Sequence, residues 1–236
     1  MISNSAVLLA LRNRALSLVV ATTGGVSLSA TATGYARAAG SFVTDGFKVG
    51  QEILSSGFTT TANNGNGVIT SVTALAMTVN AYTVAITSSG YVVTPRTLVV
   101  EATAAARTIA VGFPAMLANT NADFLPVTGV PYGEEDYVPG PAAQVTLGPL
   151  GTVELFPLYT LNIYGPSNTG ISGILSVVDA LLLSFAPRTG ITLASGDVVR
   201  IRESPAPYAG ALVQASPGWA FCPVTIPCWI RTANAI

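Results

Sequence analysis

The apolar and polar positions of residues 152–202 follow a strand–helix–strand pattern. Residues 152–164 alternate at the two-residue period of a strand, with Leu161 and Ile163 on one face and Asn162 on the other. Residues 197–202 alternate in the same way. Between them, residues 170–185 place apolar side chains at the spacing of one helix face: Ile171, Ile174, Leu175, Val178, Leu181, Leu182 and Phe185. Such a helix must bury its apolar face, so this unit predicts a sheet with a helix packed on it.

A second helix is expected near the start of the chain. Residues 4–19 carry one apolar stripe, made of Val7, Leu8, Leu11, Ala15 and Leu18. Because an isolated helix of this length is only marginally stable, we expect it to pack on the C-terminal sheet. Asn168 or Thr169 is the expected cap of the other helix.

Residues 23–107 predict a small all-β module, either a sandwich or a barrel. Apolar positions recur every second residue in short segments at 27–33, 51–55, 67–72, 76–80 and 97–101, separated by Gly- and Asn-rich turns. The turn at 63–67 contains Gly-x-Gly, but a strand follows it rather than the helix that a phosphate-binding loop requires. The module is therefore expected to be an insertion between residues 1–22 and residues 108–236 of one terminal domain.

The C-terminal region is expected to hold further short strands at residues 108–112, 143–148 and 211–215. Residues 113–141 are rich in Asn and Pro and predict a long connection. A closing strand is expected at residues 219–229. Pro223 and Pro227 favour an edge or bulged position for it, because proline lacks a donor N–H.

Charge is scarce in this chain. Half of the 236 residues are hydrophobic and only 9% are charged, compared with about a quarter in ordinary globular domains. Either a membrane or an assembly of subunits would hide such a surface. No uncharged stretch approaches the roughly 20 apolar residues of a spanning helix, so the composition favours an assembly and no membrane partner.

The charges that are present are distributed unevenly. The net charge is −1, so bulk electrostatics do not indicate nucleic-acid binding. Arg12 and Arg14 are the only charged residues up to residue 22, whereas residues 108–236 hold four basic and eight acidic residues. One hypothesis is that the basic first helix and the acidic C-terminal region form opposite sides of subunit contacts. The alternative is that the two arginines lie on a solvated helix face.

Candidate chemistry is sparse. The chain has no His, which removes the commonest general base and metal ligand. Cys222 and Cys228 are expected on one face of a strand, about 20 Å apart, as small buried side chains rather than a disulfide or a zinc site. The acidic run Glu134, Glu135 and Asp136 is open to three interpretations: a solvated or interface loop, a cation site, or acid–base catalysis. No catalytic, cofactor-binding or metal-ligating residue is assigned, and neither enzymatic activity nor a cofactor is expected.

Several turn and strand signatures together resemble a known family. They are Phe113-Pro114, Pro131-Tyr-Gly-Glu-Glu135, Tyr137-Val-Pro-Gly140, Val145-Thr-Leu-Gly148, Leu158-Tyr159, Ile163-Tyr-Gly-Pro-Ser-Asn-Thr-Gly170 and Phe185-Ala-Pro187. The chain resembles the tail terminator, or tail completion, proteins of tailed bacteriophages over its first helix and residues 107–236. The segments 45–50, 56–59 and 63–65 resemble accessory β modules of phage neck and tail proteins, which are not a standard part of a terminator.

The resemblance implies an α+β fold, a β-sheet flanked by helices, with the small β module inserted. It also implies a structural virion protein of the neck or tail, made in the host cytoplasm. Such terminators form a hexameric ring that caps the tail tube and joins it to the neck or connector protein, and DNA passes through the lumen without specific binding.

Three other functions remain open. The chain could be another tube or connector subunit of the virion, or a carbohydrate-binding decoration protein. The carbohydrate-binding hypothesis requires exposed aromatic side chains on the β module. The aromatic residues of this module are Tyr35, Phe42, Phe47, Phe58, Tyr82 and Tyr91. An enzyme would have to work with a carboxylate pair such as Glu134 and Asp136 alone.

Overall fold

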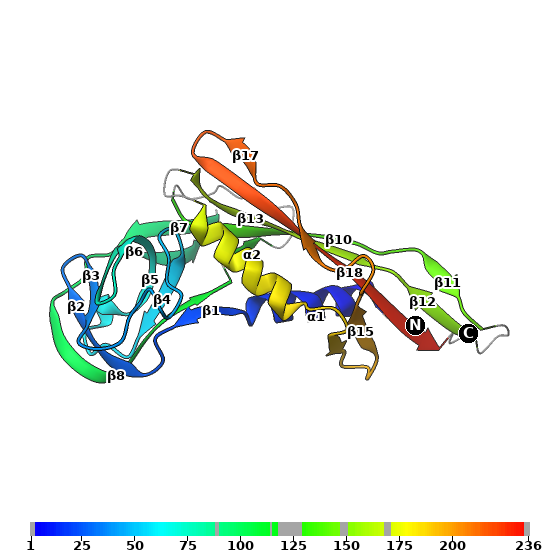
Figure 1. Ribbon diagram of the computed structural model, residues 1–236, viewed down its shortest axis with the longest axis horizontal. Coiled ribbons are helices and arrows are strands. Elements are labelled where there is room, and N and C mark those ends of the chain that lie inside the picture. Colours follow the sequence, from blue (N-terminus) through cyan, green and yellow to red (C-terminus); the bar gives the residue numbers. More distant parts are fainter. Residues whose placement is uncertain are drawn as a thin grey trace.

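The chain folds into two large β-sheet regions and two α-helices along its described length. The computed structural model describes residues 3–87, 90–113, 115–117, 129–146, 151–167 and 171–233. Figure 1 shows the two regions arranged along the long axis: strands β1–β8 gather at one end, and the strands that follow extend away from them. The expected helix caps Asn168 and Thr169 lie outside the described residues.

The first region is a closed barrel of six antiparallel strands. Around the barrel the order is β8-β2-β3-β6-β5-β4, and β4 pairs with β8 to close it. Strand β1 adds to β8, and β7 adds to β6. The elements are β1 (Val19–Thr22), β2 (Val26–Thr31), β3 (Gly34–Arg37), β4 (Glu52–Ser56), the short 3-10 helix η1 (Thr61–Asn63), β5 (Gly65–Val72), β6 (Ala76–Thr87), β7 (Gly90–Pro95) and β8 (Glu101–Gly112). Of the two architectures that the sequence left open for this module, the structure shows the barrel.

Aromatic and aliphatic side chains fill the barrel. The alternation in β2 buries Leu28 and Ala30, and Tyr35, Phe42, Phe47 and Phe58 belong to the same core. Tyr82 is also buried, at 5% exposed, but lies outside this core, and its hydroxyl donates to Glu52. The side chain of Tyr91 lies outside the described part. The described aromatic residues of the module are therefore all buried.

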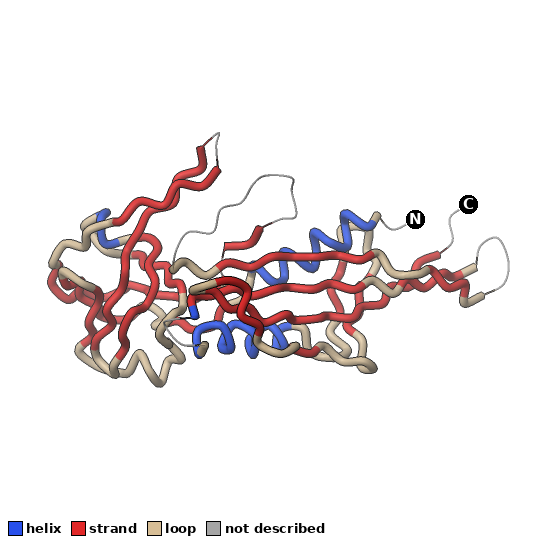
Figure 2. Tube along the Cα trace, turned by 90° about the horizontal axis from the view of Figure 1, so that it is seen from above, coloured by secondary structure: helices blue, strands red, loops and turns tan. Residues whose placement is uncertain are grey.

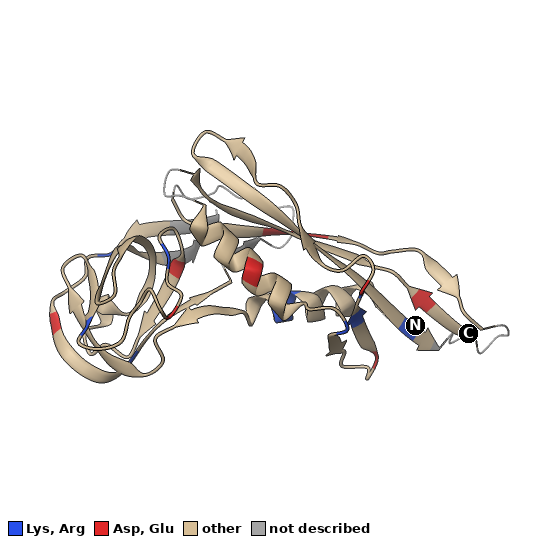
Figure 3. Ribbon diagram, viewed as in Figure 1, with Lys and Arg blue, Asp and Glu red and all other residues tan. Residues whose placement is uncertain are grey.

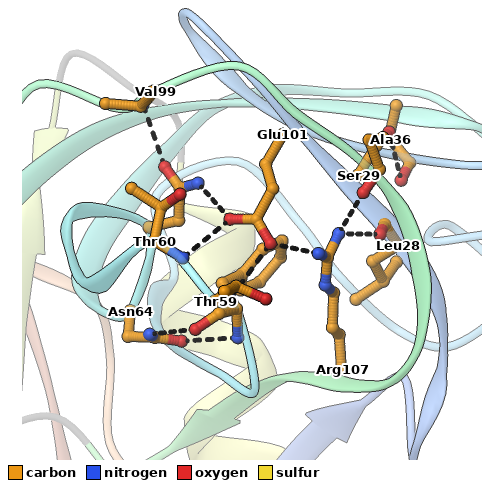
Figure 4. A network of polar contacts seen from close by, with 12 residues as sticks. Leu28, Ser29, Ala36, Thr59, Thr60, Asn64, Val99, Glu101 and Arg107 are labelled. Atoms are coloured by element: carbon orange, nitrogen blue, oxygen red, sulfur yellow. Dashed lines mark hydrogen bonds and ion pairs between the residues drawn. The ribbon is translucent and has the colours of Figure 1, made fainter.

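One polar network holds the barrel at the start of β8 (Figure 4). Glu101 accepts hydrogen bonds from Asn63 Nδ2 at 2.8 Å and from the amides of Thr59 and Thr60 at 3.0 and 3.1 Å. It also pairs with Arg107, whose guanidinium donates to the carbonyl of Leu28. Partial burial opposes the charge of Glu101, but these hydrogen bonds outweigh it and lower the pKa of the carboxyl to about 2. The network ties β8 to β2 and to the loop before η1.

The second sheet is organised by its last strand. β18 (Trp219–Ala233) pairs along one edge with β13 (Leu158–Pro166) and then β12 (Thr152–Leu155). Along its other edge it pairs in turn with β17 (Val213–Ser216), β16 (Tyr208–Ala209) and β15 (Val198–Ile201). β10 (Tyr132–Val138) and then β9 (Ala115–Leu117) follow beyond β13, while β11 (Ala142–Gln144) borders β12 and β14 (Gly190–Thr192) borders β15. Figure 2 shows these strands running side by side along the molecule.

Both α-helices contribute to one core on one face of this sheet. α1 (Asn4–Leu16) buries Val7, Leu11 and Ala15, and α2 (Ser172–Ser184) buries Ile174, Val178 and Leu181 of the predicted stripe together with Val177. Ile171 and Leu175, which the predicted stripe also included, are exposed. The strands supply Tyr159, Leu161, Ile163, Cys222, Val224, Ile226, Cys228 and Ile230 to the same core. α1 ends before the predicted residue 19 because Val19 already begins β1. Within the described residues, neither helix is long and apolar enough to cross a membrane.

Two contacts join the barrel to the second sheet. β1 and the end of β8 lie side by side, with Val19 opposite Gly112, so the chain enters and leaves the barrel at one place. The barrel loop at residues 49–51 also packs on the first turn of α2, where Gln51 Nε2 donates to Ser176 Oγ at 2.7 Å. The barrel and the second sheet have separate hydrophobic cores. The predicted domain boundaries stay a prediction.

The predicted α+β fold class is wrong, because the structure is mostly β and has only two α-helices in its described part. The expected connection at 113–141 instead contains β9 and β10. Three consecutive acidic residues are typical of a solvated loop, but in β10 they alternate between the two faces of the sheet, with Glu135 buried and Glu134 and Asp136 exposed.

The predicted edge position of residues 219–229 is also wrong, because β18 lies inside the sheet. Pro223 and Pro227 fit there because their missing donors face the edge where the partner strands are interrupted. On that edge their carbonyls accept from the amides of Gly210 and Arg202 at 2.8 and 2.9 Å. In an antiparallel strand the N–H and C=O of one residue face the same neighbouring strand. Each proline therefore lacks its N–H only on the edge where the neighbouring strands are short and interrupted.

The substitution Gly173→Ala tests the contact between α2 and the barrel. A Cβ at this position would lie 2.9 Å from the Gly50 carbonyl carbon and 3.0 Å from the Val49 oxygen, both of which are backbone atoms. Although alanine favours a helix interior, we expect the free energy of unfolding to fall by about 1–3 kcal/mol through overpacking. Thermal and urea unfolding measure it, with Ser172→Ala, an exposed position of the same helix, as the control. A more stable Gly173→Ala protein would contradict the contact.

The Glu101 network predicts a pH dependence. Because its pKa falls from 4.5 to about 2 in the fold, Glu101 stabilises the protein above pH 4.5, and this stabilisation is lost as the pH falls toward 2. Glu101→Gln should be less stable at neutral pH and should lose less stability between pH 4.5 and 2. Urea unfolding across this range measures both effects, with Asp179→Asn on the exposed side of α2 as the control. Equal pH profiles for Glu101→Gln and the original protein would refute the role of the network.

Candidate assembly surface

The two faces of the second sheet differ in what lies on them. Both helices pack on one face, so the other face carries the alternate side chains of the strands. We call this the helix-free face and define it by the outward side chains of β10, β13, β15 and β18. Its composition changes along the sheet in three parts, an aromatic end, an acidic middle and a basic end.

The aromatic end is a row of stacked rings across three strands. Tyr132, Tyr164 and Phe221 lie directly opposite one another on β10, β13 and β18. The rings of Tyr132 and Tyr164 are 4.5 Å apart, and those of Tyr164 and Phe221 are 5.0 Å apart, both stacked. Trp219 meets the Tyr132 ring edge-on at 5.3 Å. All four side chains are half-buried, so the row presents a continuous aromatic strip.

The acidic middle comes from the cluster that the sequence singled out. Glu134 and Asp136 are exposed on the helix-free face, whereas Glu135 points into the helix-covered core and is 3% exposed. Glu134 accepts a hydrogen bond from the Tyr164 hydroxyl at 3.0 Å. Burial, and then this bond, raise the pKa of Tyr164 to about 12, so the phenol stays a donor. The three carboxylates are split between two faces, and in the described chain no group of three or more His, Cys, Asp or Glu residues could hold a metal ion.

The basic end gathers the four arginines of the C-terminal region. Arg188, Arg200 and Arg202 line a cleft of about 590 Å³ together with Ile201, Glu203 and Trp229. Arg200 and Arg231 both lie over the Trp229 ring, each 5.8 Å from its centre. Arg231 pairs with Glu154 and Arg188 pairs with Glu203. Neither Arg200 nor Arg202 forms an ion pair with a carboxylate of the described residues, so the cleft keeps an excess of positive charge.

Both arginines of α1 make contacts within their own chain. Arg12 pairs with the buried Glu135, which also accepts a hydrogen bond from the Tyr159 hydroxyl at 3.0 Å. Arg14 donates to the carbonyl of Ser184 at 2.6 and 2.9 Å and lies over the Phe185 ring. Both side chains therefore hold α1 to the rest of its own chain. Substitution of either arginine is expected to destabilise the fold, so a loss of assembly in such a variant would not identify a subunit contact.

Sequence reasoning located the acidic cluster but missed the aromatic row and the basic cleft. Within each strand these residues occupy alternate positions, as side chains on one face of a sheet do. The strands themselves are up to about 90 positions apart in the sequence. The register of β10, β13 and β18 aligns the aromatic row, and the pairing of β15 with β18 places Arg200 beside Trp229. Cys222 and Cys228 do share one face of β18, as predicted, and both are buried and free.

Comparison with known proteins gives no relative: no family model, curated protein or solved structure matches the chain.

A double-mutant cycle tests the buried pair. Arg12→Met would leave the Glu135 carboxylate buried without its cation, and we expect a loss of about 3–5 kcal/mol in unfolding free energy. Arg12→Met combined with Glu135→Met removes both charges and should recover much of that loss. Chemical denaturation measures each variant. If Arg12→Met were as stable as the original protein, the pair would not hold α1.

Proposed function

We propose that the protein is a structural subunit of a homo-oligomeric ring in the virion of a tailed bacteriophage, where it ends the tail tube and joins it to the neck. The single observation that supports this most is the helix-free face. A row of four aromatic side chains beside charged patches has the composition of a subunit interface, in which aromatic residues and Arg are enriched.

The scarcity of charge supports burial of surface between copies. Only 9% of the residues are charged, and the helix-covered side also exposes apolar side chains such as Leu9, Leu16 and Leu183. A monomer seldom presents apolar patches on several sides without a partner. A ring uses two different patches of each subunit, which is consistent with apolar surface on both sides of the sheet.

Two of the segments that resemble tail terminators are neighbours in the described structure. Residues 131–140 include β10 and residues 158–167 include β13, and every residue of β10 pairs with β13. Phe185 packs beside Tyr159 of β13, with ring centres 6.5 Å apart. These two segments therefore share one part of the second sheet, and the surrounding fold is more β-rich than the resemblance implies.

The carbohydrate-binding alternative is less well supported. It requires exposed aromatic side chains on the barrel, and five of the six aromatic residues named for that role are buried. The aromatic row belongs instead to the second sheet, among side chains that stack on one another.

The test is the assembly state of the purified protein. Light scattering and negative-stain microscopy should show rings, with six-fold symmetry if the terminator resemblance holds. Tyr164→Thr combined with Phe221→Thr should lower the assembled fraction while the circular dichroism spectrum is unchanged, because threonine keeps the strands but removes the rings. Leu75→Thr, at a 48% exposed position of the barrel, is the matched control away from both faces of the second sheet.

Two results would contradict the proposal or its site. A single subunit that persists at high concentration would overturn the ring. Assembly that is lost in Leu75→Thr but kept in the double variant would show that the aromatic row is not the interface.

A further inference from the structure

We propose that the arginine cleft at Arg200 and Arg202 binds the carboxylates of Glu134 and Asp136 from a second copy of this chain. This inference rests on the proposed function, because it names the contact through which neighbouring subunits would meet. Figure 3 shows the two charge groups on different parts of the sheet, the acidic one on β10 and the basic one around β15.

The cleft is suited to a carboxylate. Arg200 is held over Trp229, and Arg202 lies over the Phe156 ring at 5.6 Å. Stacking on an aromatic ring fixes the plane of a guanidinium but leaves its N–H groups free to donate. Guanidinium groups bind carboxylates through paired hydrogen bonds, so two of them beside a cleft of about 590 Å³ form a receptor for two acidic side chains.

Glu134 and Asp136 supply the matching charge. They are two residues apart on β10 and therefore point to the same side, as Arg200 and Arg202 do at the end of β15. Both acidic residues are exposed. The two pairs thus carry opposite charge at the same spacing.

The two patches cannot neutralise each other within one chain. Asp136 is aligned with Thr225 of β18 through Thr160, whereas Arg200 is aligned with Trp229 and the Arg202 amide donates to Pro227. The nearest pair, Asp136 and Arg202, is therefore two residues apart along the strands and three strand spacings apart across the sheet, with Cα atoms about 16 Å apart. An ion pair needs about 4 Å, and salt screens charges beyond about 10 Å at 0.1 M. Only another molecule can bring the charges into contact.

A second copy is the occupant that the charges favour. The patch of one subunit would meet a different patch of the next, and when this contact is not reciprocal it is heterologous and closes into a ring if its rotation allows. An ion pair of this kind at the rim of an interface sets register and specificity, while the aromatic row supplies apolar burial.

Charge reversal tests the proposal. Arg200→Glu with Arg202→Glu, and separately Glu134→Arg with Asp136→Arg, should each raise the concentration needed for assembly about tenfold or more, because like charges then face each other. The chain that carries all four substitutions should assemble again. An equimolar mixture of the two double variants should also assemble, since every contact between unlike variants is complementary. Light scattering and microscopy at low and high salt measure all four proteins.

Control variants carry the same charge changes elsewhere. Lys48→Glu on the barrel and Asp179→Arg on α2 are both exposed, and neither should change assembly. Circular dichroism of each variant checks that the fold is intact.

The outcomes separate this inference from the proposed function. If the original protein forms rings and both double variants form them equally well, the arginine–carboxylate contact is wrong and the ring stands. If the arginine reversal blocks assembly but neither the mixture nor the fourfold variant restores it, the cleft binds something other than Glu134 and Asp136, and the inference is overturned. If the original protein forms no ring, the proposed function itself fails.

Discussion

The pairing of β18 along both of its edges is the constraint on which the C-terminal structure depends. One strand of 15 residues holds β13 and β12 on one edge and three short strands on the other. Its alternation sends Cys222, Val224 and Ile226 into the core beneath the helices and the intervening residues to the helix-free face. Because a shift of one residue would exchange the two sets, the buried core fixes the register. The same register aligns the aromatic row and separates the acidic and basic patches.

The barrel is attached to this sheet in a way that leaves the helix-free face unchanged. β1 and β8 run together where the chain passes between the two regions, and the loop at residues 49–51 rests on α2, which belongs to the covered side. The two regions have separate cores, and the Glu101 network is internal to the barrel. The aromatic row and the charged patches of the helix-free face therefore belong to the second sheet, and the barrel lies at one end of the molecule.

The sequence was most informative where a pattern is local. The alternation of β2 and the burial of Ile174, Val178 and Leu181 on one face of α2 depend on neighbouring residues and were predicted, although Ile171 and Leu175 of the same predicted stripe are exposed. The strand at residues 132–138 was missed because its carboxylates alternate between a solvated face and a buried ion pair, and the partner Arg12 lies 123 positions away. Pro223 and Pro227 indicated an edge strand because the sequence does not reveal that the partner of β18 is itself interrupted. The helix-free face could not be predicted because it exists only through the register of strands distant in the chain.

The central claim is that the helix-free face becomes buried when copies assemble. The two tryptophans of the chain, Trp219 and Trp229, lie on that face, at its aromatic and basic ends. Acrylamide quenching of tryptophan fluorescence in dissociated and assembled protein therefore tests the claim directly. The account predicts that assembly reduces the quenching and shifts the emission to shorter wavelength. Assembled protein that is quenched as strongly as single subunits would contradict it.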